Sequence, residues 1–215
     1  MPDIFDEIEE DLRAERARQF LTRYSGLILA LVAVIVIGVA GWQGCQWYQG
    51  RKDQRAAALY TQAMLEAAQP NGSRAALAAF SVLDRTAPDG YRTLARLQSA
   101  AIQAKDGQLP RALALWNQVA ADPSADPLLR DLATLLWGQH QISTGDPGLL
   151  EARLRPLTEL ANPWRFLAEE QLALLNMRQG KVAQAKDELT RLSQDGLAPN
   201  GVRERATALL AQLAG

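Results

Sequence analysis

The chain has few residues that could perform covalent or metal chemistry. Its 215 residues include one cysteine, Cys45, and one histidine, His140, which belong to different segments. A catalytic cysteine needs a base within hydrogen-bond reach, and a Cys/His zinc site needs about four ligands, so both are excluded. The acidic pairs Glu169-Glu170 and Asp187-Glu188 fall in helical patterns, where solvated faces are the usual explanation. No glycine-rich phosphate loop is present. We expect no catalytic, cofactor-binding or metal-binding residues and no enzyme activity.

Alanine and leucine dominate the composition. The chain contains 37 Ala and 34 Leu, two strong helix formers, and from residue 51 onward it has only four Val and two Ile. A sheet made from such a sequence would have little to pack on its faces, so we predict an all-α fold. The 23 basic and 24 acidic residues nearly cancel, which argues against nucleic acid as a partner.

An uncharged segment follows an acidic N-terminal tail. No charged residue occurs between Arg23 and Arg51, and the centre of this stretch reads LILALVAVIVIGV. A helix that crosses a hydrocarbon core of about 30 Å needs roughly 20 apolar residues, and Tyr24 and Trp47 suit the two interfaces. We predict a transmembrane helix at residues 24–48. The alternative is a buried core helix, in which polar breaks would be expected.

The tail, residues 1–23, carries seven acidic and four basic residues. An acidic tail disfavours a cleaved signal peptide, because signal peptides begin with a basic region. We interpret Cys45 as an unmodified thiol. Four basic residues before the segment against three after it do not fix the orientation alone. We expect a cytoplasmic tail and a larger domain on the other side, which in a bacterium is the periplasm. The tail is either solvated or an amphipathic helix with a stripe of Ile4, Phe5, Ile8 and Leu12.

A helix motif recurs in the remainder of the chain at spacings of 36, 38 and 35 residues. In the last three units a glycine stands five residues before the motif, and each unit ends near a proline. The period, turn residue and closing proline resemble tetratricopeptide repeats, whereas the alternative is an unrelated helical bundle. We predict four helix pairs in residues 49–199 and a capping helix in 200–215. The aligned second-helix residues are Ala76, Phe80, Leu83; Ala112, Trp116, Val119; Leu150, Leu154, Leu157; and Ala185, Leu189, Leu192, with Asn71, Gly107, Gly145 and Gly180 in the turns.

The first helix of each pair is expected to line a concave surface. In this register the close-packing position falls on Met64, Ala100, Gly138 and Ala173. The expected surface is mostly apolar, which suits unfolded or amphipathic polypeptide, unless neighbouring helices or the capping helix fill it. It comprises Thr61, Leu65, Leu94, Leu97, Ala101, Leu132, Leu135, Gln139, Leu167, Glu170, Leu174 and Met177.

Small residues form a stripe along one face of the predicted transmembrane helix. In lipid, small side chains let two helices approach closely enough for packing to hold them together. We predict a lateral helix contact at Gly26, Ala30, Ala33, Ala40 and Gly44.

The complete layout is similar to that of the YfgM-like ancillary subunits of the SecYEG translocon. The resemblance rests on Phe20-Leu21-x-Arg23-Tyr24-x-Gly26 entering the uncharged segment, Gly41-Trp42 and Trp47-Tyr48 leaving it, and the divergent repeats. It implies a single-span bacterial inner-membrane protein whose periplasmic domain assists emerging secreted polypeptides. The implied partners are translocon subunits and a membrane-anchored periplasmic chaperone. A scaffold for cell-division or peptidoglycan machinery would share this layout, whereas a hydrolase would need chemistry that the sequence lacks.

Overall fold

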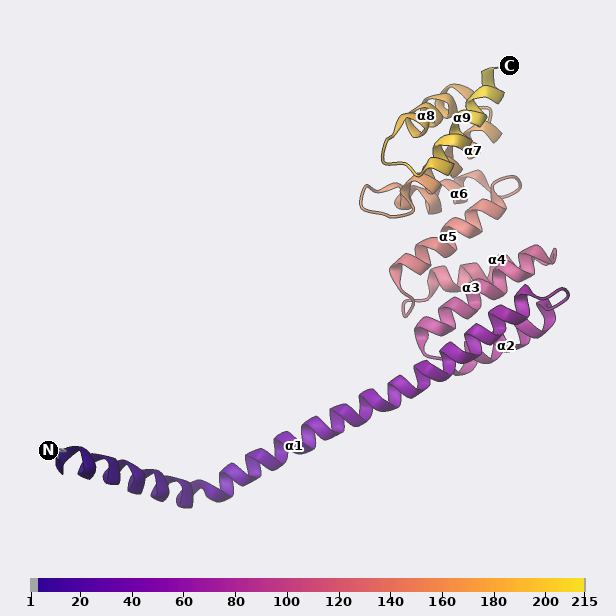
Figure 1. Ribbon diagram of the computed structural model, residues 1–215. Coiled ribbons are helices and arrows are strands. Elements are labelled where there is room, and N and C mark those ends of the chain that lie inside the picture. Colours follow the sequence, from indigo (N-terminus) through magenta and orange to yellow (C-terminus); the bar gives the residue numbers. More distant parts are fainter. Residues whose placement is uncertain (1–3, 215) are drawn as a thin grey trace. The chain divides into compact units, whose positions relative to one another are not determined.

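The computed structural model describes the backbone of residues 4–214 and the side chains of 26, 29–30, 34–48 and 50–213. Over these residues all regular elements are helices (Figure 1). Two compact units are present, residues 1–52 and 53–215. The helices are α1 (Ile4–Ala68), α2 (Ser73–Thr86), α3 (Asp89–Lys105), α4 (Leu109–Ala121), α5 (Pro127–Gln141), α6 (Pro147–Leu154), the 3-10 helix η1 (Arg155–Thr158), α7 (Arg165–Arg178), α8 (Val182–Gln194) and α9 (Asn200–Ala214).

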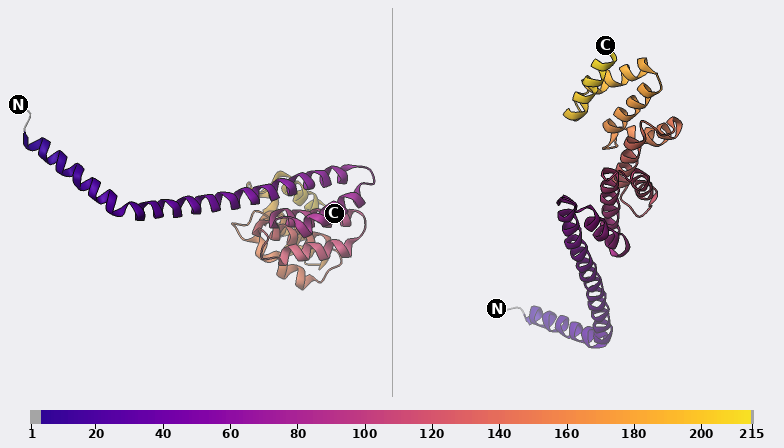
Figure 2. Two further views of the ribbon diagram at one scale, coloured as in Figure 1. Left: turned by 90° about the horizontal axis from the view of Figure 1, so that it is seen from below. Right: turned by 90° about the vertical axis from the view of Figure 1, so that its right-hand side faces the viewer.

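The second unit is a stack of helix pairs. Each helix from α2 to α9 packs against its neighbours in the sequence, and the views in Figure 2 show the helices following one another along the stack. Residues 53–68 of α1 share a buried cluster with α2. Helix α3 pairs with α4, α5 with α6, and α7 with α8, while η1 contacts α6 and α7, and α9 packs on α8. The predicted all-helical repeat arrangement is confirmed.

Asp-Pro pairs begin two of these helices. The Asp126 carboxylate accepts a hydrogen bond from the Leu128 amide at 2.8 Å, and that of Asp146 accepts one from the Leu149 amide at 2.7 Å. Each aspartate satisfies an amide that has no partner inside the helix. The proline after each aspartate occupies a position where its missing N–H costs nothing. The sequence thus fixes where α5 and α6 start.

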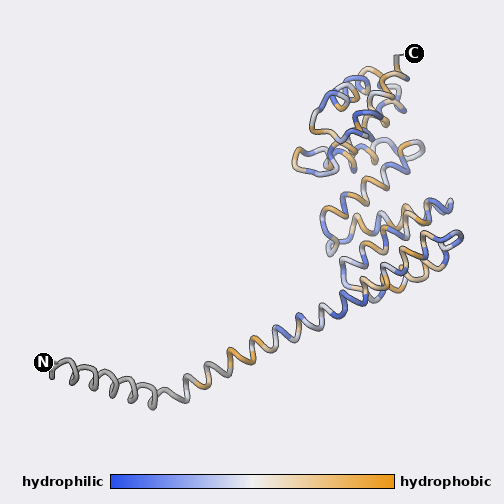
Figure 3. The backbone as a smooth tube through the Cα atoms, in the orientation of Figure 1, coloured by the Kyte–Doolittle hydropathy of each residue, from blue (hydrophilic) through white to orange (hydrophobic). Residues whose placement is uncertain are grey.

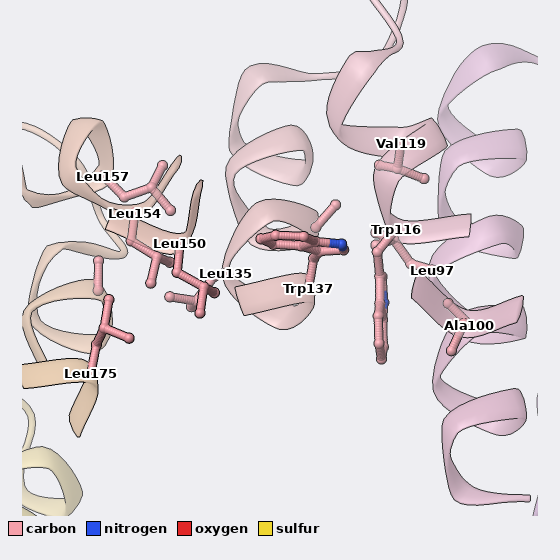
Figure 4. Packing of buried hydrophobic residues seen from close by; sticks show 13 residues of the cluster. Leu97, Ala100, Trp116, Val119, Leu135, Trp137, Leu150, Leu154, Leu157 and Leu175 are labelled. Atoms are coloured by element: carbon pink, nitrogen blue, oxygen red, sulfur yellow. The ribbon is translucent and has the colours of Figure 1, made fainter. Parts of the chain in front are cut away.

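The aligned second-helix residues form the centre of the stack. All twelve side chains are at most 4% exposed, with Ala76, Phe80, Ala112, Val119 and Leu150 among those that are fully buried. Figure 4 shows how Trp116 and Val119 of α4 and Leu150, Leu154 and Leu157 of the third pair lie within one cluster. The burial of all twelve side chains confirms the predicted register of the second helices.

In the first pair, the register predicted for the first helix is wrong by one residue. Ala63 is fully buried, whereas Met64, the residue predicted at the close contact, is 38% exposed. The other three predicted positions, Ala100, Gly138 and Ala173, are buried. An alanine fits between closely packed helices without displacing backbone, and a methionine in its place would force them apart.

The turns inside the pairs follow the predicted positions in three units of four. Asn71, Gly107 and Gly180 have φ values of 64°, 77° and 75°, a left-handed conformation that glycine and asparagine tolerate best. Gly145 does not adopt it. The third unit has a longer connection, in which Asp146 caps α6, so its chain reverses direction without a left-handed residue.

The first unit contains the uncharged segment. Figure 3 shows hydrophobic residues along this part of α1, and the described apolar side chains among them are exposed. Among the described residues, no helix has an apolar stretch long enough to cross a membrane. That statement does not cover the whole predicted segment 24–48. The side chains of residues 24, 25, 27, 28 and 31–33 lie outside the described part of the chain. The predicted amphipathic stripe in residues 4–12 also lies outside it.

Candidate protein-binding surfaces

Hydrogen bonds between residues 36 apart hold successive pairs in register. Gln171 Nε2 donates to the Leu135 carbonyl at 3.1 Å, and Trp164 Nε1 donates to the Leu128 carbonyl at 3.0 Å. Because aligned positions of adjacent units are 35 to 38 residues apart, each bond joins nearly corresponding positions of adjacent pairs. Two further bonds of the same separation run from Arg178 to the Ile142 carbonyl and from Arg153 to Asn117, each at 2.7 Å.

Gly138 of α5 lies directly against side chains of α6 and α7. A β-carbon there would lie 2.9 Å from both Gln171 Oε1 on α7 and Leu154 Cδ2 on α6. Real β-carbons almost never come so near to other heavy atoms, so only glycine fits without displacement. The close contact predicted at this position is therefore present, and it is made with the side chains of Leu154 and Gln171.

The residues predicted to line the concave surface differ widely in exposure. Leu97, Leu135 and Glu170 are at most 8% exposed and offer almost no surface to a partner. Leu97 and Leu135 instead join the cluster that surrounds Trp116 (Figure 4), because successive first helices stack over them. The half-buried members are Leu94, Leu132, Leu167, Leu174 and Met177, and the exposed members are Thr61, Leu65, Ala101 and Gln139.

The shifted register also changes this surface in the first pair. With Ala63 at the close contact, Tyr60 and Met64 take the positions that had been assigned to Thr61 and Leu65. Tyr60 is half-buried, with its ring centroid 5.7 Å from that of Phe80 and 6.0 Å from that of Tyr91. The first pair therefore presents a methionine and the edge of an aromatic cluster on this face.

Helix α9 closes the C-terminal end of the same face. The carboxylate of Glu170 accepts two hydrogen bonds from the Arg205 guanidinium, both at 2.6 Å, and this interaction raises the pKa of Arg205. Leu167 and Met177 pack against a cluster that includes Val202 and Ala206 of α9. The part of the surface formed by α7 is thus partly filled by the chain itself.

His140 has a packing role. Its ring stacks on Trp116 with a centroid distance of 4.8 Å and an interplanar angle of 18°, which joins α5 to α4. The guanidinium of Arg153 lies 4.2 Å from the ring centroid of Trp137 in a similar contact. Among the described residues no group of three or more His, Cys, Asp and Glu side chains could hold a metal ion.

The stripe of small residues in the first unit is described only in part. Gly26, Ala30, Ala40 and Gly44 are exposed, and a β-carbon added to Gly26 or Gly44 would meet nothing within 4 Å. The side chain of Ala33 lies outside the described residues. A helix contact through this stripe stays a prediction.

A cleft between the third and fourth pairs was not foreseen from the sequence. It has a volume of about 540 Å³ and lies beside η1, α7, α8 and the loop before α9. The signal that could have revealed it is Pro156, which falls inside the second helix of the third pair and ends it early. The lining residues are Arg155, Thr158, Leu160, Arg165, Glu169, Leu172, Glu188, Arg191, Asp195 and Leu197.

Residues 18–146 match the model of a protein family described as a tetratricopeptide repeat-like domain. No curated protein and no solved structure matches the chain significantly. Repeats of this kind typically serve as non-catalytic scaffolds for protein–protein interaction, with binding surfaces formed by the stacked helices. Because the match covers more than half of the chain and the stacked pairs agree with it, this protein belongs to the tetratricopeptide repeat-like domain family.

Proposed function

We propose that this chain is a non-enzymatic, membrane-anchored interaction protein that assists secreted or periplasmic polypeptides as they emerge from the translocon. The observation that carries the proposal is the extent of the family match. It begins at residue 18, so it includes the whole uncharged segment 24–48 together with the first repeats. Because the family model includes this segment together with the repeats, we take the segment to be part of the functional protein. We place the tail in the cytoplasm and the repeats in the periplasm of a bacterial inner membrane.

The exposure of the uncharged segment supports an anchor. Val34, Ile35, Val36 and Ile37 are between 56% and 71% exposed. Four consecutive residues of a helix point in all directions around its axis, so none of its faces is covered by described parts of the chain. Such a surface needs lipid or a protein partner around it.

Aromatic and basic residues at the end of the segment support the same interpretation. The Arg51 guanidinium lies 3.9 Å from the ring centroid of Trp47, and Lys52 Nζ lies 4.5 Å from that of Tyr48. Rings of this kind favour the membrane–water interface, and the paired cations suit the headgroup region. The repeats would begin directly beyond that boundary.

The open part of the concave surface supplies the polypeptide-binding site. Leu94 and Leu132 are half-buried there, and the exposed Ala101 and Gln139 lie about two helical turns beyond them on the same helices. A half-open apolar strip fits short apolar segments of many sequences, because the hydrophobic contact is not directional. The proposed partners, namely translocon subunits and a membrane-anchored chaperone, follow from the resemblance of the layout.

Co-purification after mild detergent extraction tests this function. Wild-type protein should recover translocon subunits and cross-link to newly exported polypeptides. A double variant, Ala101→Glu with Gln139→Glu, places charge on the open surface at exposed positions, so it should lose those cross-links and still recover the translocon. Gln118→Glu, at an exposed position of α4, is the matched control. Recovery of cell-wall enzymes alone would contradict the proposal and favour an envelope scaffold of another kind.

The small-residue stripe is the proposed contact within the membrane. Replacing Ala33 and Ala40 by Ile keeps the segment apolar but blocks close approach of a second helix. We expect this variant to insert normally and to lose cross-links to its membrane partners. Unchanged cross-linking and co-purification would remove the lateral contact from the proposal without affecting the anchor.

A further inference from the structure

Two asparagines of the chain are followed directly by glycine. They are Asn71, in the turn between α1 and α2, and Asn200, the first residue of α9. The backbone nitrogen after an asparagine can attack the side-chain amide carbon of that asparagine, and a glycine at this place leaves the nitrogen accessible. The nitrogen loses its proton, ammonia leaves from the side chain, and a cyclic imide forms. Water then opens the imide to aspartate or to iso-aspartate, in which the backbone runs through the side chain.

The fold protects the first of these pairs. The Gly72 amide donates a hydrogen bond to the Gln69 carbonyl at 3.0 Å, so its nitrogen is already engaged. Gly72 is buried, and a β-carbon added there would overlap the Glu66 carbonyl oxygen, because the turn encloses the backbone tightly. The same turn holds Asn71 in a left-handed conformation. Attack on Asn71 therefore requires the turn between α1 and α2 to open.

The second pair lacks this protection. Asn200 and Gly201 are both exposed, and the Gly201 amide donates no hydrogen bond to any residue that the structure describes. The reason is that the first amides of a helix have no partner inside it. The bonds that start α9 run from the Val202 and Arg203 amides to the Pro199 carbonyl, at 2.9 and 3.1 Å. Rotation of the Gly201 nitrogen toward the Asn200 side chain thus disturbs only the first turn of α9.

The surroundings of Asn200 favour the reaction. Arg203 donates a hydrogen bond to Asn200 Oδ1, the atom that gains negative charge when the neighbouring carbon is attacked. Both residues line an open hollow of about 550 Å³ beside α8 and α9, together with Ser193, Glu204 and Thr207. Water can therefore reach the side chain, as hydrolysis of the imide requires.

We propose that Asn200–Gly201 is a site of spontaneous deamidation in the folded protein, and that its iso-aspartate product loosens the start of α9. Iso-aspartate lengthens the backbone by one carbon, so the first turn of the helix cannot keep its hydrogen bonds. Val202, in that turn, packs in one cluster with Leu167 and Met177 of α7. The modification therefore uncovers part of the concave surface that α9 fills. It depends on neither the membrane anchor nor a partner protein.

Ageing of the full-length protein in mild detergent at neutral pH tests the site. Trypsin places the two pairs in separate peptides, residues 56–74 and 192–203, and mass spectrometry measures the conversion of each. Asn200 should convert about tenfold faster than Asn71, because opening one helical turn costs less free energy than opening a packed helix pair. In denaturant the two rates should become equal. Digestion in heavy-oxygen water marks any conversion that occurs after ageing.

Gly201→Ala is the matched variant. An added β-carbon would lie 3.4 Å from Arg205 Nη1, the end of a flexible side chain, so the fold should be retained while the attack is hindered. This variant should convert about tenfold more slowly than the wild type, with helix content unchanged by circular dichroism. Conversion of Gly201→Ala at the wild-type rate would contradict the proposed attack.

Amide exchange tests the effect on α9. Aged wild-type protein should exchange the amides of α9 faster than fresh protein. Asn200→Asp, which has the new charge without the longer backbone, should exchange like fresh protein. The site is overturned if the two asparagines convert at equal rates in the folded protein, or if their rates differ as much in denaturant. The loosening of α9 is overturned if aged and fresh protein exchange alike, or if Asn200→Asp exchanges as fast as aged protein.

Discussion

Gly138 has no room for a side chain. Its helix is regular, yet a β-carbon would lie 2.9 Å from Gln171 Oε1 and from Leu154 Cδ2. Gln171 is itself buried and is held by its bond to the Leu135 carbonyl, so it has little freedom to move away. A larger residue at this position would have to displace the side chains of Gln171 and Leu154.

Gly138→Leu should destabilise the repeat domain by about 1 to 3 kcal/mol, because the new side chain must displace those of Gln171 and Leu154 in the packed interior. Thermal unfolding followed by circular dichroism measures the effect. Gly90→Leu is the control, since Gly90 is an exposed helical residue with nothing within 4 Å of an added β-carbon. A melting temperature of Gly138→Leu equal to that of the wild type would contradict the close contact.

Ionisation of Glu169 should make the stability of the repeat domain depend on pH. Burial raises the pKa of its carboxyl above 4.5, and the nearby Arg165 only partly opposes this shift. An acid with a raised folded-state pKa destabilises the fold once it is ionised, so stability falls as pH rises through that pKa. The side chain is 37% exposed, so the effect should be less than about 1 kcal/mol.

Glu169→Gln should therefore raise the melting temperature slightly at pH 7. The advantage should shrink as pH falls through the raised folded-state pKa, and it should be lost below about 4.5, where Glu169 is protonated in both the folded and the unfolded state. Melting curves of the two proteins between pH 4 and pH 7 measure the difference. An advantage that is constant with pH would assign the effect to packing instead of ionisation.

Among the helices, α9 depends on a single charged contact in addition to its apolar face. Glu170 is 7% exposed and receives both of its hydrogen bonds from Arg205. Arg205→Ala would leave that carboxylate buried without its partner. Because the Arg205 side chain is 53% exposed, we expect a cost of about 1 to 3 kcal/mol, less than for a fully buried pair.

This loss should be local to the C-terminal end. Amide exchange in α9 should accelerate, while α3 and α4 keep their protection. Arg205→Lys should be intermediate, since a lysine keeps the charge without the two parallel hydrogen bonds. If α9 exchanges at the wild-type rate in Arg205→Ala, its apolar contacts alone hold it in place.

Helix spacing predicted the second helices well because each places three apolar residues on one buried stripe, the first of them a small alanine in three of the four. The first helix of the first pair was harder, since Ala63 and Met64 are adjacent in an alanine-rich stretch in which two registers look alike. Burial of Leu97, Leu135 and Glu170 depends on how the pairs curve over one another, which periodicity does not encode. The cleft depends on the early end of α6, and Pro156 was its only sign in the sequence.

At the scale of the whole molecule, the uncharged segment and the repeats are separate compact units. The acidic tail and the resemblance of the layout lead us to expect the repeats on the periplasmic side. Protease added to intact spheroplasts should then digest residues 53–215, while an epitope in residues 1–23 stays protected. Digestion that requires lysis of the membrane would reverse the orientation, and a cytoplasmic marker protein serves as the control for leakage.

The buried residues of the repeats form three clusters that divide the stack along its length. One surrounds Phe80 in the first pair, one surrounds Trp116 and extends from α3 to α7, and one joins α7 and α8 to Val202 of α9. When a cluster unfolds, its residues lose their contacts together, whereas few contacts join neighbouring clusters. Pulling on the chain from its C-terminus should therefore give stepwise extension, with the α9 end yielding before the central block that holds both Trp116 and Trp137.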